Sequence, residues 1–372
     1  MKNSLAATPS WSSSINTLAQ NGTRSKTRII SLPGVVHGRG ADISNVKQMQ
    51  RWAEEKFIMS HLVRKLADTA KSRGDFEMSD SYWNCFYCAK RVITGDGRLF
   101  TNYCKTRVCA VCNGIRKAEK IHLFLPVVQS WPDPFSMVLT VKSVSAEGLK
   151  KRIDEMYSLI RRIVQKYRKR SQRGAKQRLK GIRVFECTYN PTTKEYHPHF
   201  HFVVADRLTA DILRNEWIAE GQELWGKDAV YQGSQVFTRI ENNEEALERI
   251  IKYGTKIFTE TNPRNKKSKK GVYIQALDTI ISEMKGRRIF DRFGFNLPKQ
   301  PPQEKQVKCL ENYKEWTFVS KDADWLEKDG ALTLSNYVAT PETKRFLSDS
   351  IVDENRYVIS MWKGQRFVEK QE

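Results

Sequence analysis

The sequence has little that would direct it to a membrane. It contains no apolar run approaching the ~18 residues that a membrane-spanning helix needs. Its N-terminus, which begins Met1-Lys2-Asn3, lacks the apolar stretch of a secretory signal. No lipidation motif or basic amphipathic terminus is present either. We therefore expect a cytoplasmic protein with no membrane partner.

Acidic residues are also scarce relative to basic ones. The chain has 42 Asp and Glu against 64 Lys and Arg, a formal net charge of +22. A surplus of this size implies a polyanionic partner, and the absence of membrane features favours nucleic acid.

The basic residues are densest between Arg161 and Arg183, where eleven Lys or Arg occur without one acidic residue. One interpretation is a solvated helix face. Because so many like charges repel one another, a phosphate partner explains the run better. The DNA contacts predicted here are Arg168, Lys169, Arg170, Arg173 and Lys176.

Composition divides the chain into five segments. Residues 1–45 are rich in Ser, Thr, Gly, Asn and Arg without a period, and we expect them to be mostly disordered. Residues 46–130 combine a charged helix with a cysteine cluster, and residues 131–261 form a compact core. Residues 262–297 are a basic linker and a helix. Residues 298–372 form a C-terminal region to which the sequence assigns no role.

The core segment alternates between strand and helix patterns. Strands are predicted at 135–142, 182–189, 197–205 and 229–240, and helices at 149–167 and 208–225, before a last helix capped by Asn243. The resulting β-α-β-β-α-β order predicts an α+β fold of the ferredoxin-like, split β-α-β type. Its antiparallel sheet would be covered by helices on one face and open to a substrate on the other.

Half of the six histidines fall within five residues of one predicted strand, in the segment YHPHFHFVV. Side chains alternate along a strand, so His199 and His201 face the same way while Phe200 points into the core. Two imidazoles in this arrangement can share one divalent cation. His197 has the same parity but precedes Pro198 at the strand entrance, so it belongs either to this site or to a DNA contact.

The neighbouring strand supplies a third ligand. If residues 191–194 form the hairpin turn, Asn190 pairs with Glu195 and Glu186 falls opposite His199. Directly opposed residues share a face of the sheet. Imidazoles with a carboxylate suit Mn²⁺ or Mg²⁺, and nitrogen favours Mn²⁺.

The final core helix carries Tyr253 and Lys256, three residues apart and therefore on one face. A free phenol has a pKa near ~10 and is a poor nucleophile, but an adjacent ammonium and a metal-bound phosphate favour attack. Considered alone, Tyr253 is best explained as a packing residue. Considered beside the histidine strand, it is the candidate nucleophile.

Five of the seven cysteines lie within 28 residues, which indicates metal binding. Cys85 and Cys88 form one C-x-x-C knuckle, and Cys109 and Cys112 form another. Four thiolates suit structural Zn²⁺ in a zinc-ribbon-like insertion. A redox role would leave the pairing of two knuckles unexplained. Cys104 is either an additional thiol or a replacement for one of these four.

Taken in order, these motifs resemble the Rep initiators of rolling-circle plasmids, the Rep_1-type branch of the HUH endonuclease superfamily. The matching segments are FSMVLTV around Ser136, HPHFHFVV from His197, and KYGTK from Lys252. FECTYN and Gly286-Arg287-Arg288 are also similar to the family. The resemblance covers roughly residues 82–295.

The resemblance implies an HUH nuclease core with helical and C-terminal additions, in a bacterial or archaeal cytoplasm. Glu186, His199 and His201 would hold Mn²⁺ or Mg²⁺, and Tyr253 would attack single-stranded origin DNA to give a 5′-phosphotyrosine and a free 3′-OH. Lys256 would position the phosphate, and the same site can rejoin strands. The implied partners are a host helicase, single-strand-binding protein and DNA polymerase; the oligomeric state is left open.

One residue departs from the family pattern. Some members place a glutamate four residues before the tyrosine to activate water for termination, and here that residue is Arg249, which we expect to contact DNA. Termination is therefore in doubt. Two other interpretations remain: an HUH transposase or relaxase, and a zinc-containing DNA-binding protein without catalysis.

Overall fold

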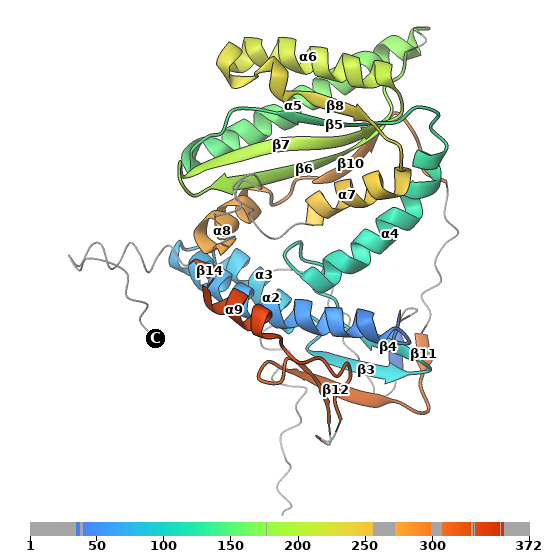
Figure 1. Cartoon of the computed structure of the whole chain (residues 1–372), viewed down its shortest axis with the longest axis vertical. Coiled ribbons are helices and arrows are strands. Elements are labelled where there is room, and N and C mark those ends of the chain that lie inside the picture. Colours follow the sequence, from blue (N-terminus) through green and yellow to red (C-terminus); the bar gives the residue numbers. More distant parts are fainter. Residues whose placement is uncertain are drawn as a thin grey trace, which may run out of the picture.

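Two hydrophobic cores organise the protein, one around each of two five-stranded sheets. The computed structural model describes residues 35–37, 40–175, 177–255, 272–298, 307–328, 330, 332–349 and 351–352. Most of the N-terminal segment predicted to be disordered (1–34), much of the basic linker (262–271) and the side chain of Tyr253 lie outside the described part, as do Lys176 and Lys256. Figure 1 shows the two sheets separated by a layer of helices.

The first sheet has the strand order β10-β6-β7-β5-β8, with every neighbour antiparallel. Its strands are β5 (Phe135–Thr140), β6 (Gly181–Asn190), β7 (Glu195–Val204), β8 (Val236–Arg239) and β10 (Phe290–Phe293). The α+β class with an antiparallel sheet is therefore confirmed. β8 is shorter than predicted because residues 227–229 and 232–234 form two 3₁₀ turns.

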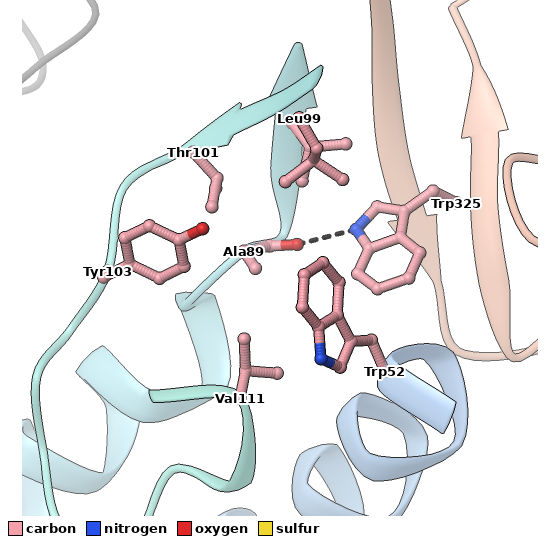
Figure 2. Close-up of a pocket in the computed structure, with 8 residues that line it drawn as sticks. Trp52, Ala89, Leu99, Thr101, Tyr103, Val111 and Trp325 are labelled. Atoms are coloured by element: carbon pink, nitrogen blue, oxygen red, sulfur yellow. Dashed lines mark hydrogen bonds between the residues drawn. The ribbon is translucent and has the colours of Figure 1, made fainter. Parts of the chain in front are cut away.

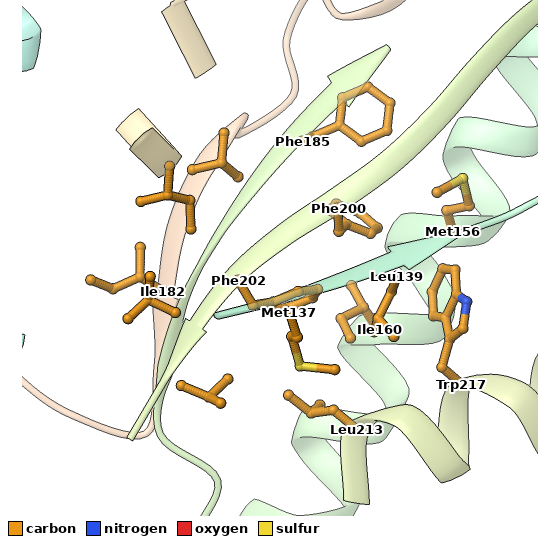
Figure 3. Close-up of a cluster of buried hydrophobic side chains, with 14 of the residues drawn as sticks. Met137, Leu139, Met156, Ile160, Ile182, Phe185, Phe200, Phe202, Leu213 and Trp217 are labelled. Atoms are coloured by element: carbon orange, nitrogen blue, oxygen red, sulfur yellow. The ribbon is translucent and has the colours of Figure 1, made fainter. Parts of the chain in front are cut away.

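Two helices cover one face of this sheet: α5 (Ala146–Gln172) and α6 (Arg207–Trp225). Phe200 of β7 contacts both helices, since its ring lies 5.2 Å from that of Tyr157 on α5 and 6.1 Å from that of Trp217 on α6. Figure 3 shows Phe200 and Trp217 among the apolar side chains between strands and helices. The chain order β5, α5, β6, β7, α6, β8 is the predicted one.

The other face of the sheet is partly covered, whereas the sequence predicted it to be open. Here α7 (Asn243–Thr255) packs on β6 and β7, and α4 (Ala110–Gln129) packs on α7 (Figure 1). Leu247, Ile250 and Ile251 are the buried residues of α7, so an apolar stripe fixes it to the sheet. Its cap is Asn242 rather than the predicted Asn243, since the Asn242 Oδ1 accepts from the backbone N–H of Glu244 and Glu245.

The second sheet has the order β13-β12-β3-β4-β2 and joins segments far apart in the sequence. Its strands are β2 (Ala41–Asp42), β3 (Arg91–Gly95), β4 (Arg98–Thr101), β12 (Lys314–Val319) and β13 (Asp324–Glu327). The long helix α2 (Val46–Ser72), α3 (Phe76–Tyr87), α8 (Ile274–Glu283) and α9 (Pro341–Asp349) pack nearby.

A tryptophan of the C-terminal region shows how closely this part is joined to the cysteine region. The indole Nε1 of Trp325 donates to the carbonyl of Ala89 at 2.7 Å. Trp52 of α2 and Tyr103 line the same small cavity (Figure 2). The C-terminal strands are thus part of the second core.

A helix that crosses a lipid bilayer must be both long and apolar. Within the described ranges, none combines the length and the apolar character that crossing it would demand.

Candidate metal centres

The predicted carboxylate and histidines meet on the face of the first sheet that α7 partly covers. The hairpin register is the predicted one, with Asn190 opposite Glu195 and Glu186 opposite His199. Oε2 of Glu186 lies 3.1 Å from Nε2 of His199 and 2.9 Å from Nε2 of His201. The three donor atoms fall within 4.8 Å of one another, which makes them a candidate metal-binding group.

The tautomer of His199 favours a cation between these atoms. Its Nδ1 lies 3.0 Å from the backbone carbonyl of His197, an oxygen that can only accept a hydrogen bond. In the neutral ring the proton is then on Nδ1, and the lone pair on Nε2 faces the Glu186 carboxylate. Two such lone pairs repel unless a proton or a metal ion lies between them. A backbone carbonyl that orients a ligand histidine in this way is typical of metal sites.

Burial strengthens this argument. Glu186 is 7% exposed and His199 is 8% exposed. A carboxylate removed from water needs a positive partner or a set of hydrogen bonds. A divalent cation held by Glu186, His199 and His201 would meet that need.

His197, which the sequence left between two roles, lies beside this group without joining it. Its Nε2 hydrogen-bonds the Thr140 hydroxyl on β5, and its ring lies 5.2 Å from that of His199. Burial lowers the pKa of His197 to about 4, and His199 adds to the shift. The contact with Thr140 fixes the strand entrance next to the candidate ligands.

The predicted nucleophile belongs to α7, the helix on the same face as the histidines. The backbone of Tyr253 lies in its last turn, one helical turn after the buried Ile250. Arg249 is exposed and pairs with Glu245 at 2.6 Å. The side chain of Tyr253 and the whole of Lys256 lie outside the described part, so their contacts stay predictions.

Four cysteines lie at the ends of two helices, and a fifth, Cys104, lies in the segment between those helices. Cys85 lies in α3 and Cys88 caps its C-terminus, while Cys109 caps the N-terminus of α4 and Cys112 lies in its first turn. The β3–β4 hairpin and the segment with Cys104 connect the two pairs. The helix dipole at the start of α4 favours thiolates there.

The four thiols that come together differ from the predicted set by one residue. Cys88, Cys104, Cys109 and Cys112 have sulfur atoms within 4.8 Å of one another. The Cys104 sulfur lies 3.7 Å from that of Cys112, and Cys85, which is outside this group of four, hydrogen-bonds Cys104 and Cys109. Hydrogen bonds from Cys109, Cys112 and the other thiols lower the pKa of Cys104. Four thiolates in this geometry fit a tetrahedral ion.

A buried lysine beside the cluster was not found from the sequence. Lys56 of α2 is 3% exposed, and its ammonium donates to the carbonyl of Phe86. Burial lowers its pKa, while the thiolates of Cys88 and Cys85 oppose the shift. The sequence signal that could have revealed Lys56 is a lysine on the apolar stripe of a helix, because a lysine buried there needs an anionic partner.

Four of the predicted DNA contacts lie close together at the C-terminal end of α5. Arg168, Lys169, Arg170 and Arg173 are all exposed. The Arg170 guanidinium lies 5.0 Å from the ring of Tyr167. These four side chains therefore present their charge to solvent.

Comparison with known proteins supports the resemblance to replication proteins. The family model Rep_1, described as Replication protein, matches residues 98–222. The resemblance to Rep_1-type replication proteins is thereby confirmed. The match includes Cys104 to Cys112, Glu186 and both candidate ligand histidines, and it ends before α7.

Particular relatives carry the name Protein rep. One from Staphylococcus aureus is 26% identical over 223 residues, covering 56% of this chain and 90% of that protein. One from a Bacillus species is 30% identical over 143 residues, 36% of this chain and 44% of the relative. A third, from Bacillus amyloliquefaciens, is 30% identical over 118 residues, 30% of this chain and 33% of the relative. No solved structure matches the chain.

Proposed function

We propose that this protein initiates rolling-circle replication of a plasmid by nicking one DNA strand at the origin and rejoining it later. The observation that carries the proposal is the Glu186–His199–His201 group in a chain that resembles Rep_1 replication proteins. The proposed substrate is the single strand exposed at the origin.

The strand order supports an HUH-type nuclease core. Numbered along the β-α-β-β-α-β unit, the strand order β6-β7-β5-β8 is 2-3-1-4, which a split β-α-β arrangement gives. Both connecting helices lie on one face, and the candidate ligands occupy the other. In this proposal the DNA strand approaches the candidate ligands on the face opposite the connecting helices, beside α7.

The donor atoms decide which ions fit. Two imidazoles and a carboxylate match Mn²⁺ or Mg²⁺, with open positions for phosphate oxygens, and Glu186, His199 and His201 would hold the ion. Such an ion supplies Lewis-acid polarisation of the scissile phosphate. The cysteine cluster fits Zn²⁺ in a structural role, because its thiols lie between α3, α4 and the second sheet.

The proposed chemistry at Tyr253 is a phosphoryl transfer. Its phenolic oxygen forms a bond to phosphorus as the bond to the 3′ oxygen breaks, and the phenolic proton is lost while the leaving 3′ oxygen gains one. The products are a 5′-phosphotyrosyl link and a 3′-OH that primes a polymerase. Lys256 would hold the phosphate in line, and reversal of the step rejoins strands. A host helicase and single-strand-binding protein are the proposed partners.

Termination needs a group other than the residue four positions before Tyr253. That residue is Arg249, which pairs with Glu245. Glu248 lies 3.8 Å from Lys117 of α4. We assign neither acid a role in activating water, and propose that Arg249 contacts DNA when the strand displaces Glu245.

The experiment is a covalent-adduct assay. Labelled single-stranded oligonucleotides that tile the replicon encoding this protein are incubated with it, with and without Mn²⁺. We expect a denaturation-resistant adduct with one oligonucleotide, formed by the wild type and by Tyr231→Phe, a control at an exposed tyrosine. Tyr253→Phe should form none.

Each outcome bears on a different part of the proposal. An adduct that survives Tyr253→Phe would refute the nucleophile. No adduct from the wild type on any oligonucleotide, with DNA binding intact, would favour a DNA-binding protein without catalysis.

A further inference from the structure

A groove lies between α5 and the edge strand β10, on the side of the sheet away from the candidate metal ligands. It has a volume of about 710 Å³. Its walls come from α5, from β6, from the loop around Gly286 and from β10. Arg183 points into it from the face of β6 that also carries Phe185, whose ring packs against Tyr157 of α5. The groove is thus distinct from the histidine site.

Five arginines and two aspartates line the groove, so its charged side chains carry a positive surplus. Asp154 pairs with Arg287 at 2.6 Å, and Asp291 pairs with Arg183 at 3.1 Å. Arg288 is 82% exposed, and its contact with the same Asp291 is loose, at 3.9 Å. These two aspartates therefore face a larger number of guanidinium groups.

Two further observations concern the arginines of this groove. The Arg183 guanidinium lies over the rings of Tyr157 and Phe200, at 5.0 Å and 5.5 Å, and its buried Nη1 has no hydrogen-bond acceptor among the described residues. Arg161 of α5 is exposed at the rim and makes no ion pair within that same part of the chain. Phosphate oxygens are the best-matched acceptors for guanidinium groups, and the exposed Arg161 and Arg288 are the ones that a phosphate can reach.

The loop that presents Arg287 and Arg288 is held rigidly in place. The Tyr157 hydroxyl donates to the carbonyl of Arg288 at 3.0 Å. Arg107 donates to the carbonyl of Met284 at 3.0 Å and to that of Arg287. Arg107 belongs to the segment between Cys104 and Cys109, so the cysteine cluster anchors the loop. A prearranged loop loses less entropy when it binds a ligand.

The exposure of the aromatic lining residues distinguishes between single-stranded and duplex nucleic acid as the ligand. Its two aromatic residues, Tyr157 and Phe293, are each 8% exposed, so the groove offers no stacking platform for single-stranded bases. Guanidinium groups on a rigid surface contact phosphates irrespective of sequence. On α5, Arg161 is followed seven residues later by the exposed Arg168 on the same helical face, which extends the basic track.

We propose that this groove binds the phosphodiester backbone of duplex DNA, as a second contact separate from the strand that is cut. It deepens the proposed function, since the natural duplex would be the one flanking the nicked origin. The binding itself requires neither the metal ligands nor Tyr253. Gly286-Arg287-Arg288, which resembles a family segment, thereby receives a physical role.

The test is fluorescence anisotropy with a labelled duplex of about 25 base pairs and arbitrary sequence, with the purified full chain and no added Mn²⁺ or Mg²⁺. The variant is Arg161→Ala/Arg288→Ala. Loss of two phosphate contacts should raise Kd roughly tenfold and lower the slope of log K against log salt by about 2. Arg288→Glu alone should weaken binding as well. Because the Arg288 side chain is exposed, this substitution should leave the fold intact, so misfolding would not explain the weaker binding.

The matched control is Lys344→Ala/Arg345→Ala, which removes two exposed charges from α9, outside the groove. It should leave Kd and the slope close to those of the wild type. Equal losses in both double variants would reveal a general charge effect and overturn the proposal. An unchanged slope in the groove variant would also overturn it, as would a loss seen only with single-stranded DNA. The adduct assay is scored separately, so failure of nicking leaves this result interpretable.

Discussion

Glu186 and His201 lie on neighbouring antiparallel strands, with a carboxylate oxygen 2.9 Å from the imidazole Nε2, although 15 residues separate them in the chain. The same oxygen is 3.1 Å from His199. One carboxylate oxygen close to two imidazole nitrogens is an arrangement that a cation stabilises, and it makes Glu186 the centre of the candidate site.

Replacing Glu186 with glutamine tests this arrangement. Glu186→Gln keeps the shape of the side chain but removes its negative charge, so we expect Mn²⁺ affinity to fall roughly 100-fold. Isothermal titration with Mn²⁺ measures the change. Glu195→Gln, at the start of the same hairpin, should bind Mn²⁺ like the wild type. Unaltered affinity in Glu186→Gln would exclude the carboxylate as a ligand.

The cysteine cluster predicts a difference between two nearby thiols. Because Cys104 belongs to the compact group of four and Cys85 lies outside that group, Cys104→Ser should weaken zinc retention far more than Cys85→Ser. We expect a difference of roughly tenfold to 100-fold, measured as zinc release to a chromogenic chelator. The reverse ranking would restore the pair of C-x-x-C knuckles as the ligand set.

Lys120 of α4 gives the protein a defined dependence on pH. Its ammonium lies 4.0 Å from the centre of the Phe290 ring. Burial, with Arg116 and Arg107 nearby, lowers its pKa from 10.5 to about 8. Between these values the unfolded chain binds more protons than the folded one, so this residue makes stability rise with pH from about 8 to 10.5.

Below about pH 8 the destabilisation by Lys120 is fully present. Lys120→Met should therefore be more stable than the wild type at neutral pH, and the gap should narrow as pH approaches 10.5. Urea unfolding at several pH values measures both effects. Lys151→Met, at an 83% exposed side chain, is the control and should show no such trend. A constant gap across this range would contradict the assignment.

A glycine fixes the chain where it leaves β10. Gly294 has φ +78°, and a Cβ there would meet the Leu179 carbonyl oxygen at 1.8 Å. Gly174 also has positive φ, +96°, but no neighbour within 4 Å. We expect Gly294→Ala to cost about 3 kcal/mol or more and Gly174→Ala only about 1 kcal/mol. Chemical denaturation of both variants separates the steric effect from the backbone effect. Equal losses of stability in the two variants would refute the steric role of Gly294.

The sequence alone determined the histidine strand and its partner. Side-chain alternation placed His199 and His201 on one face, and a four-residue turn set the register that brought Glu186 opposite His199. Strand alternation and hairpin register depend on residues close together in the chain, so local rules suffice. The same is true of the amphipathic helices α5 and α6.

Only the tertiary structure decided which distant segments meet. Trp325 bonds to Ala89 across 236 residues, Arg107 holds the carbonyl of Arg287 across 180, and Cys104 joins the cluster that spacing alone assigned to Cys85. β10 likewise closes the edge of the first sheet beside Arg183. No periodicity encodes these contacts, because they arise when separately formed elements bury their apolar faces against one another and satisfy the polar groups enclosed between them.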